Sequence, residues 1–83
     1  MDSGKRLRRT VADMLRKRRR WTGLRQVDIA RGMGCTQAAV AAFEAGREDA
    51  LVSTVVRFLL AAGYMDLALT MRRGRRSWRV RLG

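Results

Sequence analysis

The stretch RQVDIARGMGCTQAAVAAFEAG, residues 25–46, decides the fold of this 83-residue chain. Apolar residues recur at helical spacing on either side of Gly34. A glycine just past a last helical turn adopts the left-handed cap without a side-chain penalty, so Gly34 is expected to end a first helix. Thr36 stands where an N-cap belongs, because its hydroxyl can accept from a backbone N–H two or three residues on. The stretch therefore predicts two short helices joined by a tight turn, the second ending near Gly46.

Seven residues in this stretch stand at the spacings of a known motif. They are Gln26, Ala30, Gly34, Gln37, Val40, Glu44 and Gly46. These spacings resemble the helix-turn-helix of lambdoid phage repressors and Cro proteins, the XRE-type family, over roughly residues 15–64. A small residue at position 30 also lets two helices cross tightly, and Val40 fills the space between them. The alternative interpretation is a plain αα-hairpin, which can use the same small residue and glycine.

The resemblance implies a mode of DNA binding. The helix over residues 36–44 is expected to enter the major groove, with the preceding helix across the backbone. Gln37 is the principal reader, since its amide can donate to adenine N7 and accept from adenine N6 together. Ala38, Ala41 and Ala42 stand where relatives often carry longer polar side chains. They offer methyl contacts with thymine and few hydrogen bonds, which shifts specificity toward DNA shape.

Three further positions are expected near phosphates. Gln26 and Thr36 begin the two helices of the motif, where free N–H groups and the helix dipole favour an anion. Arg47 follows the second helix. For Thr36 a capping role alone, and for Arg47 a solvated side chain, are the alternatives. The resemblance also implies a structural ion pair between Arg19 and Glu44, whereas three of the five residues in the basic run 16–20 are expected to be a solvated face.

The composition favours a nucleic-acid partner and disfavours catalysis. Nineteen Lys and Arg residues against seven Asp and Glu residues give a formal net charge of +12. Guanidinium groups neutralise phosphates and fork onto phosphate or guanine oxygens, so double-stranded DNA is the expected partner. A membrane surface would attract the same charge, but no lipid-facing stripe accompanies it. With no histidine, no carboxylate pair and no phosphate-cradling glycine loop, we expect no enzyme, no metal and no cofactor.

The sequence shows no membrane span or secretory signal and contains one cysteine, a combination for which we expect a cytoplasmic protein. No apolar run reaches the length of a membrane span, and the first ten residues lack the apolar segment of a secretory signal. Cys35 is the only cysteine, so a disulfide framework is excluded and the thiol is expected to be buried by packing. The protein is expected in a bacterial cytoplasm, encoded by a phage or by the bacterium.

Outside the central stretch, the periodicity predicts two more helices. Residues 1–9 are expected to be frayed, and a first helix runs from Thr10 to about Arg20, with Thr10 and Asp13 at capping-box spacing. Arg25 stands where the resembling family usually has Ser, Thr or Asn as the N-cap of the next helix. Asp28, in the first turn of that helix, partly offsets the missing cap through the helix dipole. After residue 50, an apolar stripe predicts a fourth helix that closes the core and is stopped by Gly63; a late break would make a fifth. The stripe is Leu51, Val52, Val55, Phe58, Leu59 and Ala62.

Beyond Tyr64 the apolar period changes from about 3.6 residues to two. This change predicts a C-terminal β-hairpin, which should find another sheet or lie on the helices because a lone two-stranded ribbon is marginal in water. Trp78, Val80 and Leu82 share one strand face and are the predicted dimerisation residues. The expected domains are residues 1–64 for DNA binding and 65–83 for a basic dimerisation tail.

The predicted fold class is therefore mostly α: a four- to five-helix repressor-like bundle with a helix-turn-helix, plus a C-terminal β-hairpin or strand used in dimerisation. The function it implies is a sequence-specific transcriptional regulator, Cro-like or repressor-like, that binds a palindromic operator as a homodimer. The alternative is an antitoxin that binds a toxin and represses its own operon, since such proteins often dimerise through a short C-terminal strand. Both hypotheses share the same DNA-binding motif.

Overall fold

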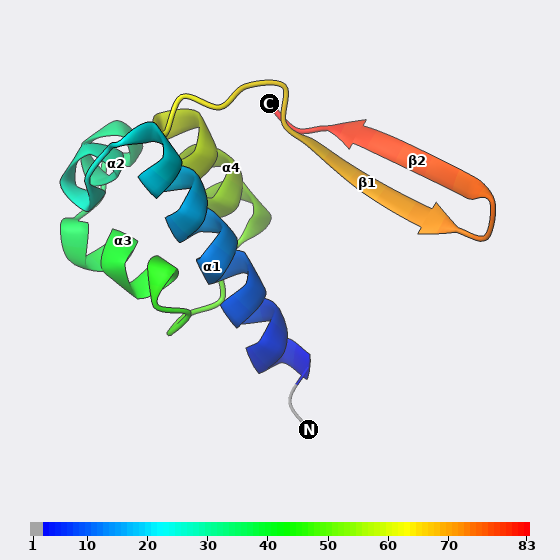
Figure 1. Cartoon of the computed structure of the whole chain (residues 1–83), viewed down its shortest axis with the longest axis horizontal. Helices are drawn as coiled ribbons and strands as arrows, with labels where there is room; N and C mark the ends of the chain where they lie inside the picture. Colours follow the sequence, from blue (N-terminus) through cyan, green and yellow to red (C-terminus); the bar gives the residue numbers. More distant parts are fainter. Residues whose placement is uncertain (1–2) are drawn as a thin grey trace.

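The computed structural model describes residues 3–83 and shows four helices followed by an antiparallel hairpin (Figure 1). The elements are α1 Ser3–Thr22, α2 Gln26–Met33, α3 Gln37–Glu44, α4 Val52–Ala61, β1 Ala68–Arg73 and β2 Arg76–Arg81. The predicted fold class, a mostly helical bundle with a helix-turn-helix and a C-terminal hairpin, is confirmed. The bundle in residues 3–83 has four helices, so the fifth considered at the end of α4 is not formed.

The first helix begins earlier than the sequence suggested. α1 starts at Ser3, so residues 3–9 of the segment expected to fray are helical, while residues 1 and 2 lie outside the described part of the chain. The capping box expected at Thr10 was wrong, because Thr10 lies inside the helix and its hydroxyl donates to the carbonyl of Arg6 at 3.0 Å. Asp13 pairs with Lys17 at 2.9 Å instead. Lys, Arg and Leu are good helix formers, which lets the helix extend backward from its packed half.

The turn between α2 and α3 follows the chemistry expected of it. Gly34 adopts φ 69° and ends α2, and its N–H bonds to carbonyls of the last turn. Thr36 is the N-cap of α3, with its hydroxyl oxygen accepting from the N–H of Ala39 at 3.1 Å. At the start of α2, the carboxylate of Asp28 accepts from the backbone N–H of Arg25 at 2.8 Å, which satisfies a donor in the absence of a capping side chain.

One side chain from each helix forms the centre of the core. Leu15 of α1, Ile29 of α2, Val40 of α3 and Phe58 of α4 are fully buried and contact one another in a single cluster. Burying each of them stabilises the fold by about 1.5–3 kcal/mol relative to leaving it exposed. Cys35 packs against this cluster half-buried, so its thiol is a packing group that is less enclosed than predicted.

The apolar stripe of α4 is only partly used by the core. Phe58 and Ala62 are buried, and Val55 and Leu59 pack against the cluster half-buried. The prediction that the whole stripe closes the core was wrong for its first two residues, because Leu51 and Val52 at the start of α4 remain exposed. α2 contacts α4 near the other end of that helix, where Gly32 faces Ala61.

That crossing is unusually close. A Cβ added to Gly32 of α2 would lie 2.9 Å from the Cβ of Ala61 in α4, nearer than real Cβ atoms approach. Gly32 thus allows α2 and α4 to touch through their backbones. The sequence analysis expected a small residue, Ala30, at the crossing of α2 with α3, and Ala30 is buried; it made no prediction for the crossing of α2 with α4.

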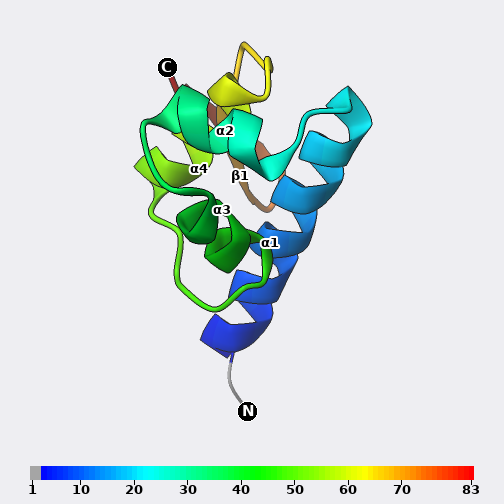
Figure 2. The same cartoon turned by 90° about the vertical axis from the view of Figure 1, so that its left-hand side faces the viewer.

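The hairpin projects away from the bundle. Its register pairs Leu69 with Val80 and Met71 with Trp78, and Gly74 at φ 62° opens the two-residue turn. Figures 1 and 2 show α2 and α3 at one end of the molecule and the hairpin at the other. Of the two alternatives expected for the ribbon, lying on the helices was wrong and pairing with another sheet stays a prediction. Its paired apolar side chains, Leu69, Met71, Trp78 and Val80, are 45–50% exposed.

The base of the hairpin is tied to the helices. The hydroxyl of Tyr64 donates to the carbonyl of Arg18 at 3.1 Å, and the N–H of Leu82 bonds to the carbonyl of Leu67 at 2.7 Å. Gly83 lies beside Val56 and Leu60 of α4. The division into residues 1–64 and 65–83 stays a prediction.

None of the helices in residues 3–83 combines the length and the apolar composition needed to cross a bilayer.

Candidate nucleic-acid interface

The second helix of the motif, α3, has one inward and one outward side. Val40 and Glu44, four residues apart, are buried against the other helices. Gln37 and Ala38 at the beginning of α3 are exposed, and Ala41 and Ala42 are half-buried. The outward side therefore presents one long polar side chain, Gln37, at the N-terminal end of the helix.

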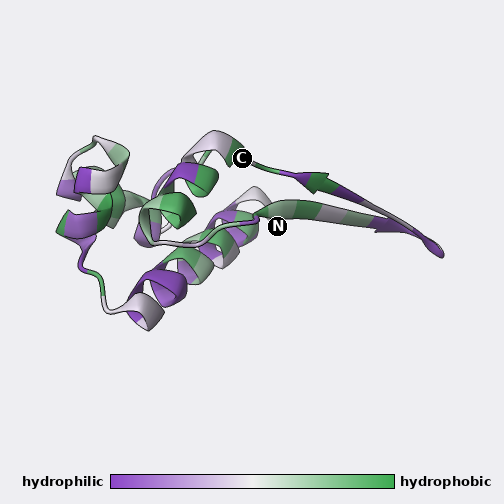
Figure 3. Ribbon diagram, turned by 90° about the horizontal axis from the view of Figure 1, so that it is seen from above, coloured by the Kyte–Doolittle hydropathy of each residue, from purple (hydrophilic) through white to green (hydrophobic). Residues whose placement is uncertain are grey.

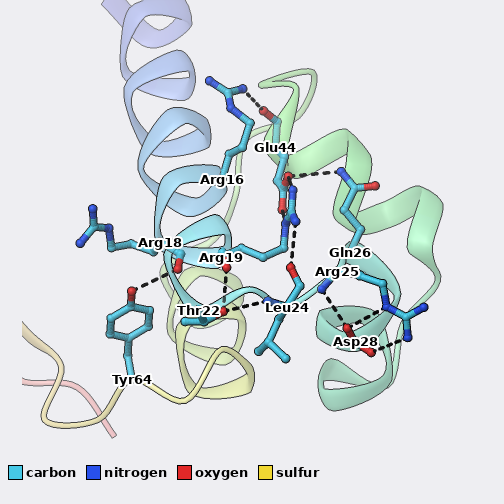
Figure 4. A network of polar contacts seen from close by, with 10 residues as sticks. All are labelled: Arg16, Arg18, Arg19, Thr22, Leu24, Arg25, Gln26, Asp28, Glu44 and Tyr64. Atoms are coloured by element: carbon cyan, nitrogen blue, oxygen red, sulfur yellow. Dashed lines mark hydrogen bonds and ion pairs between the residues drawn. The ribbon is translucent and has the colours of Figure 1, made fainter.

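Glu44 is held by donors from α1 and α2. The guanidinium of Arg19 is bidentate on it, with Nε donating to Oε2 at 2.6 Å and Nη2 donating to Oε1 at 2.8 Å. The amide of Gln26 donates to Oε1 at 3.2 Å. Arg16 donates to the backbone carbonyl of Glu44 at 3.1 Å. Figure 4 shows these side chains converging from α1 and α2 on the end of α3, so the network fixes the orientation of α3.

The network is charged and almost closed to water. Glu44 is 3% exposed, and the side chain of Arg19 is 12% exposed. Burial raises the pKa of the Glu44 carboxyl, but the hydrogen bonds from Arg19 and Gln26 and the nearby positive charge outweigh it. The net pKa of Glu44 lies below its ordinary value. Arg19 also donates to the carbonyl of Leu24 at 3.0 Å, which ties the loop before α2 to the same pair.

The remaining predicted DNA-contacting residues flank α3 and α2. Thr36 is exposed and keeps its hydroxyl proton for an outside acceptor, since its oxygen serves as the cap. Arg47 is exposed just past Gly46, which has φ 69° and passes close to α1. Gln26 is half-buried, and its side-chain amide already donates to Glu44. Its backbone N–H, at the first position of α2, is the group that it offers to an anion.

Comparison with known proteins agrees with this geometry. Residues 10–72 match a family model described as a helix-turn-helix domain. The chain belongs to this helix-turn-helix family. The family lies within the XRE/Cro-like group, so the suspected membership is confirmed. No curated protein and no solved structure matches the chain.

Membership settles the general class of activity. The protein is a DNA-binding regulator of the helix-turn-helix type. Such domains are typically not enzymes. The matched segment begins inside α1 and ends in β1, so it spans the entire motif and the first strand of the hairpin.

Besides the hydrogen bond from Gln26 to Glu44, two contacts made by arginines escaped the sequence analysis. Arg16 belongs to the basic run 16–20, in which the sequence analysis gave a contact to Arg19 alone, yet Arg16 reaches the carbonyl of Glu44. Arg57 of α4 donates to the carbonyl of Met33, one of the carbonyls left free at the end of α2. Spacing along one helix carries no signal for either contact, because each joins residues more than twenty positions apart.

Proposed function

We propose that this helix-turn-helix protein is a sequence-specific transcriptional regulator, Cro-like or repressor-like, that binds a palindromic operator as a homodimer and blocks polymerase by occupying it. It acts in the bacterial cytoplasm and needs no cofactor. The observation that carries the proposal is the exposure of Gln37 at the N-terminal end of α3, on a helix whose opposite side is fixed by Val40 and Glu44.

In this proposal Gln37 reads one adenine in the major groove through its amide. Ala38, Ala41 and Ala42 place methyl groups against the bases and leave room for close approach of the helix. Thr36, Arg47 and the N–H group of Gln26 contact phosphates and set the register of α3. Because Gln37 is the single long polar side chain on this side, sequence-dependent DNA shape supplies the rest of the specificity.

The reading role is tested with Gln37→Ala on a site selected from a random duplex library. Affinity for the selected site should fall by about 1–3 kcal/mol, with relaxed preference at one base pair, and affinity for random DNA should stay unchanged. Arg47→Ala is the control, because losing a phosphate contact weakens selected and random sequences alike. Equal losses for Gln37→Ala on both kinds of DNA contradict the assignment.

The dimer interface is proposed on the apolar face of the hairpin. Trp78 and Val80 are exposed there in line with Leu82, and their cross-strand partners Met71 and Leu69 extend the same face. A second copy related by a two-fold axis would cover this face and hold two copies of α3 for half-sites about 34 Å apart.

Val80→Lys tests this interface, with Thr70→Lys as a control that adds the same charge at a neighbouring position on the opposite face. Sedimentation at micromolar concentration should give a dimer for the wild type and for Thr70→Lys, and a monomer for Val80→Lys. A monomeric wild type contradicts the homodimer. If that monomer co-purifies with a second protein from its own operon, the antitoxin alternative is favoured.

A further inference from the structure

The hairpin has a second face, which carries charge. In an antiparallel pair, directly opposed residues share a face and successive residues alternate. The register therefore puts Arg72, Arg79 and Arg81 together on the face opposite Trp78 and Val80, beside Thr70 and Ser77. Three more arginines surround the turn at Gly74: Arg75 in the turn itself, and Arg73 and Arg76, which the register puts at the tip of the face that carries Trp78 and Val80. Figure 3 shows β1 changing from apolar near the bundle to hydrophilic at the tip, while hydrophilic and apolar segments alternate along β2.

None of this charge is neutralised by the described part of the molecule. Residues 67–83 contain six arginines and no Asp or Glu. All six are exposed, and the ion pairs found within residues 3–83 join residues of the bundle and its loops. Arg73 and Arg76 are directly opposed across the strands, an arrangement that destabilises a ribbon. Charged side chains protect an exposed sheet edge from aggregation. Six arginines without a carboxylate among them also favour a polyanionic partner.

The two-stranded shape of the hairpin and its arginine side chains both suit duplex DNA. A two-stranded β-ribbon fits the major groove, which is about 12 Å wide. Guanidinium groups bind phosphate oxygens in bidentate pairs. The charged face carries three arginines, Thr70 and Ser77, and it has no Asn, Gln or carboxylate. Its guanidinium groups can neutralise phosphates along the groove whatever the base sequence. We propose that the basic face and tip of the hairpin form a second DNA site, which binds phosphates without reading sequence.

The position of the hairpin site means that it binds a different DNA segment from the one bound by α3. The hairpin extends from the end of the molecule opposite α2 and α3 (Figure 1). A duplex seated on α3 is therefore out of reach of the same chain's hairpin tip, and the basic face binds another segment of DNA. The apolar part of the other face, formed by Leu69, Met71, Trp78 and Val80, points the other way and stays available to a second copy. The protein thus bridges two DNA segments.

The first test compares two triple variants with equal loss of charge. Arg72→Gln, Arg79→Gln and Arg81→Gln remove the basic face. Arg6→Gln, Arg18→Gln and Arg20→Gln remove three exposed arginines of α1. Affinity for a random duplex is measured by fluorescence anisotropy across a salt series. The slope of log affinity against log salt should fall by about 0.9 per lost phosphate contact in the hairpin variant, hence by up to about 3, and by clearly less in the α1 variant. Equal reductions overturn the proposal, because net charge alone would then explain the binding.

The second test asks for two duplexes at once. With one duplex tethered to a surface and a second one labelled, the wild type should retain both. The hairpin variant should remain bound to the tethered duplex and release the labelled one. Gln37→Ala should bridge as the wild type does on random DNA, which separates failure of this site from failure of α3. Retention of the labelled duplex by the hairpin variant, or equal competition by phosphatidylserine vesicles, overturns the assignment to DNA.

Discussion

Arginine stands in two contrasting settings at the two ends of this molecule. In the bundle, Arg19 is nearly buried, holds Glu44 with two hydrogen bonds and ties the loop at Leu24 to the same pair. In the hairpin, Arg79 and Arg81 stand on an exposed face with no acidic residue within the same element. The difference separates two uses of one side chain: a paired guanidinium positions a helix, whereas an unpaired one is available to an outside anion. Each use makes its own demands on stability and binding.

The largest effect is expected from the paired arginine. Arg19→Met strands the Glu44 carboxylate in a site that is 3% exposed. Unfolding free energy should fall by about 3 kcal/mol or more, which lowers the melting temperature by roughly 10 °C or more for a domain of this size. Arg79→Met is the matched control on the hairpin and should change stability by less than about 0.5 kcal/mol. Thermal and urea unfolding followed by circular dichroism measure both.

The double variant Arg19→Met with Glu44→Leu sharpens the same contrast. Replacing a buried ion pair by apolar side chains is often neutral, so this variant should recover part of the stability lost in Arg19→Met. If it recovers nothing, the loss in the single variant comes from packing and from the contact with Leu24, and the ion pair is not the main term. Equal destabilisation by Arg79→Met would erase the distinction between the two ends.

A smaller effect is expected where α2 and α4 touch. Gly32→Ala gains about 1 kcal/mol of helix propensity but forces a Cβ against Ala61, and overpacking of this kind costs about 1–3 kcal/mol. The variant should be destabilised by up to about 2 kcal/mol in urea unfolding. Adding Ala61→Gly makes room and should restore part of the loss. An unchanged or raised stability in Gly32→Ala would show that the crossing can widen without cost.

The smallest effect is expected from acid. The pKa of Glu44 is lower in the folded state than the value of about 4.3 for an unfolded chain. Its stabilising contribution is therefore complete above that value and is lost as the pH falls through the folded pKa. Residues 67–83 have no Asp or Glu, so no side chain of the hairpin titrates in this range. Unfolding measured between about pH 5 and pH 2.5 should be less pH-dependent in Glu44→Gln than in the wild type. Identical pH profiles would assign the acid sensitivity to Asp13 and Asp28, whose pKa values are also lowered.

Local chemistry explains which parts of the fold were predictable. Gly34 and Thr36 each act on neighbours within a few residues, so spacing alone located the turn. The start of α1 was misjudged because residues 3–9 carry little apolar periodicity, and the helix there continues from its packed half. Strand alternation likewise gave the hairpin. Its direction in space depends on the connection from Tyr64 to Leu67, for which pattern reasoning has no rule.

The site was predictable to a similar depth. The exposure of Gln37 on α3 and the contact of Arg19 with Glu44 both followed from the family resemblance, not from periodicity. The hydrogen bond from Gln26 to Glu44 was not foreseen, and neither was the contact from Arg16. Both contacts depend on how α1, α2 and α3 cross, and the residue pattern of one helix does not predict that crossing.

The projecting hairpin has a kinetic consequence. Its backbone hydrogen bonds rest on two strands and on side chains that are open to water, so they can open while the bundle stays folded. Amide protons of β1 and β2 should therefore exchange with solvent deuterium through local opening, whereas those of α2 and α3 wait for global unfolding. A partner that covers the hairpin, whether a second copy or DNA, would slow exchange at one end of the chain alone. Exchange rates thus report occupancy of the hairpin residue by residue.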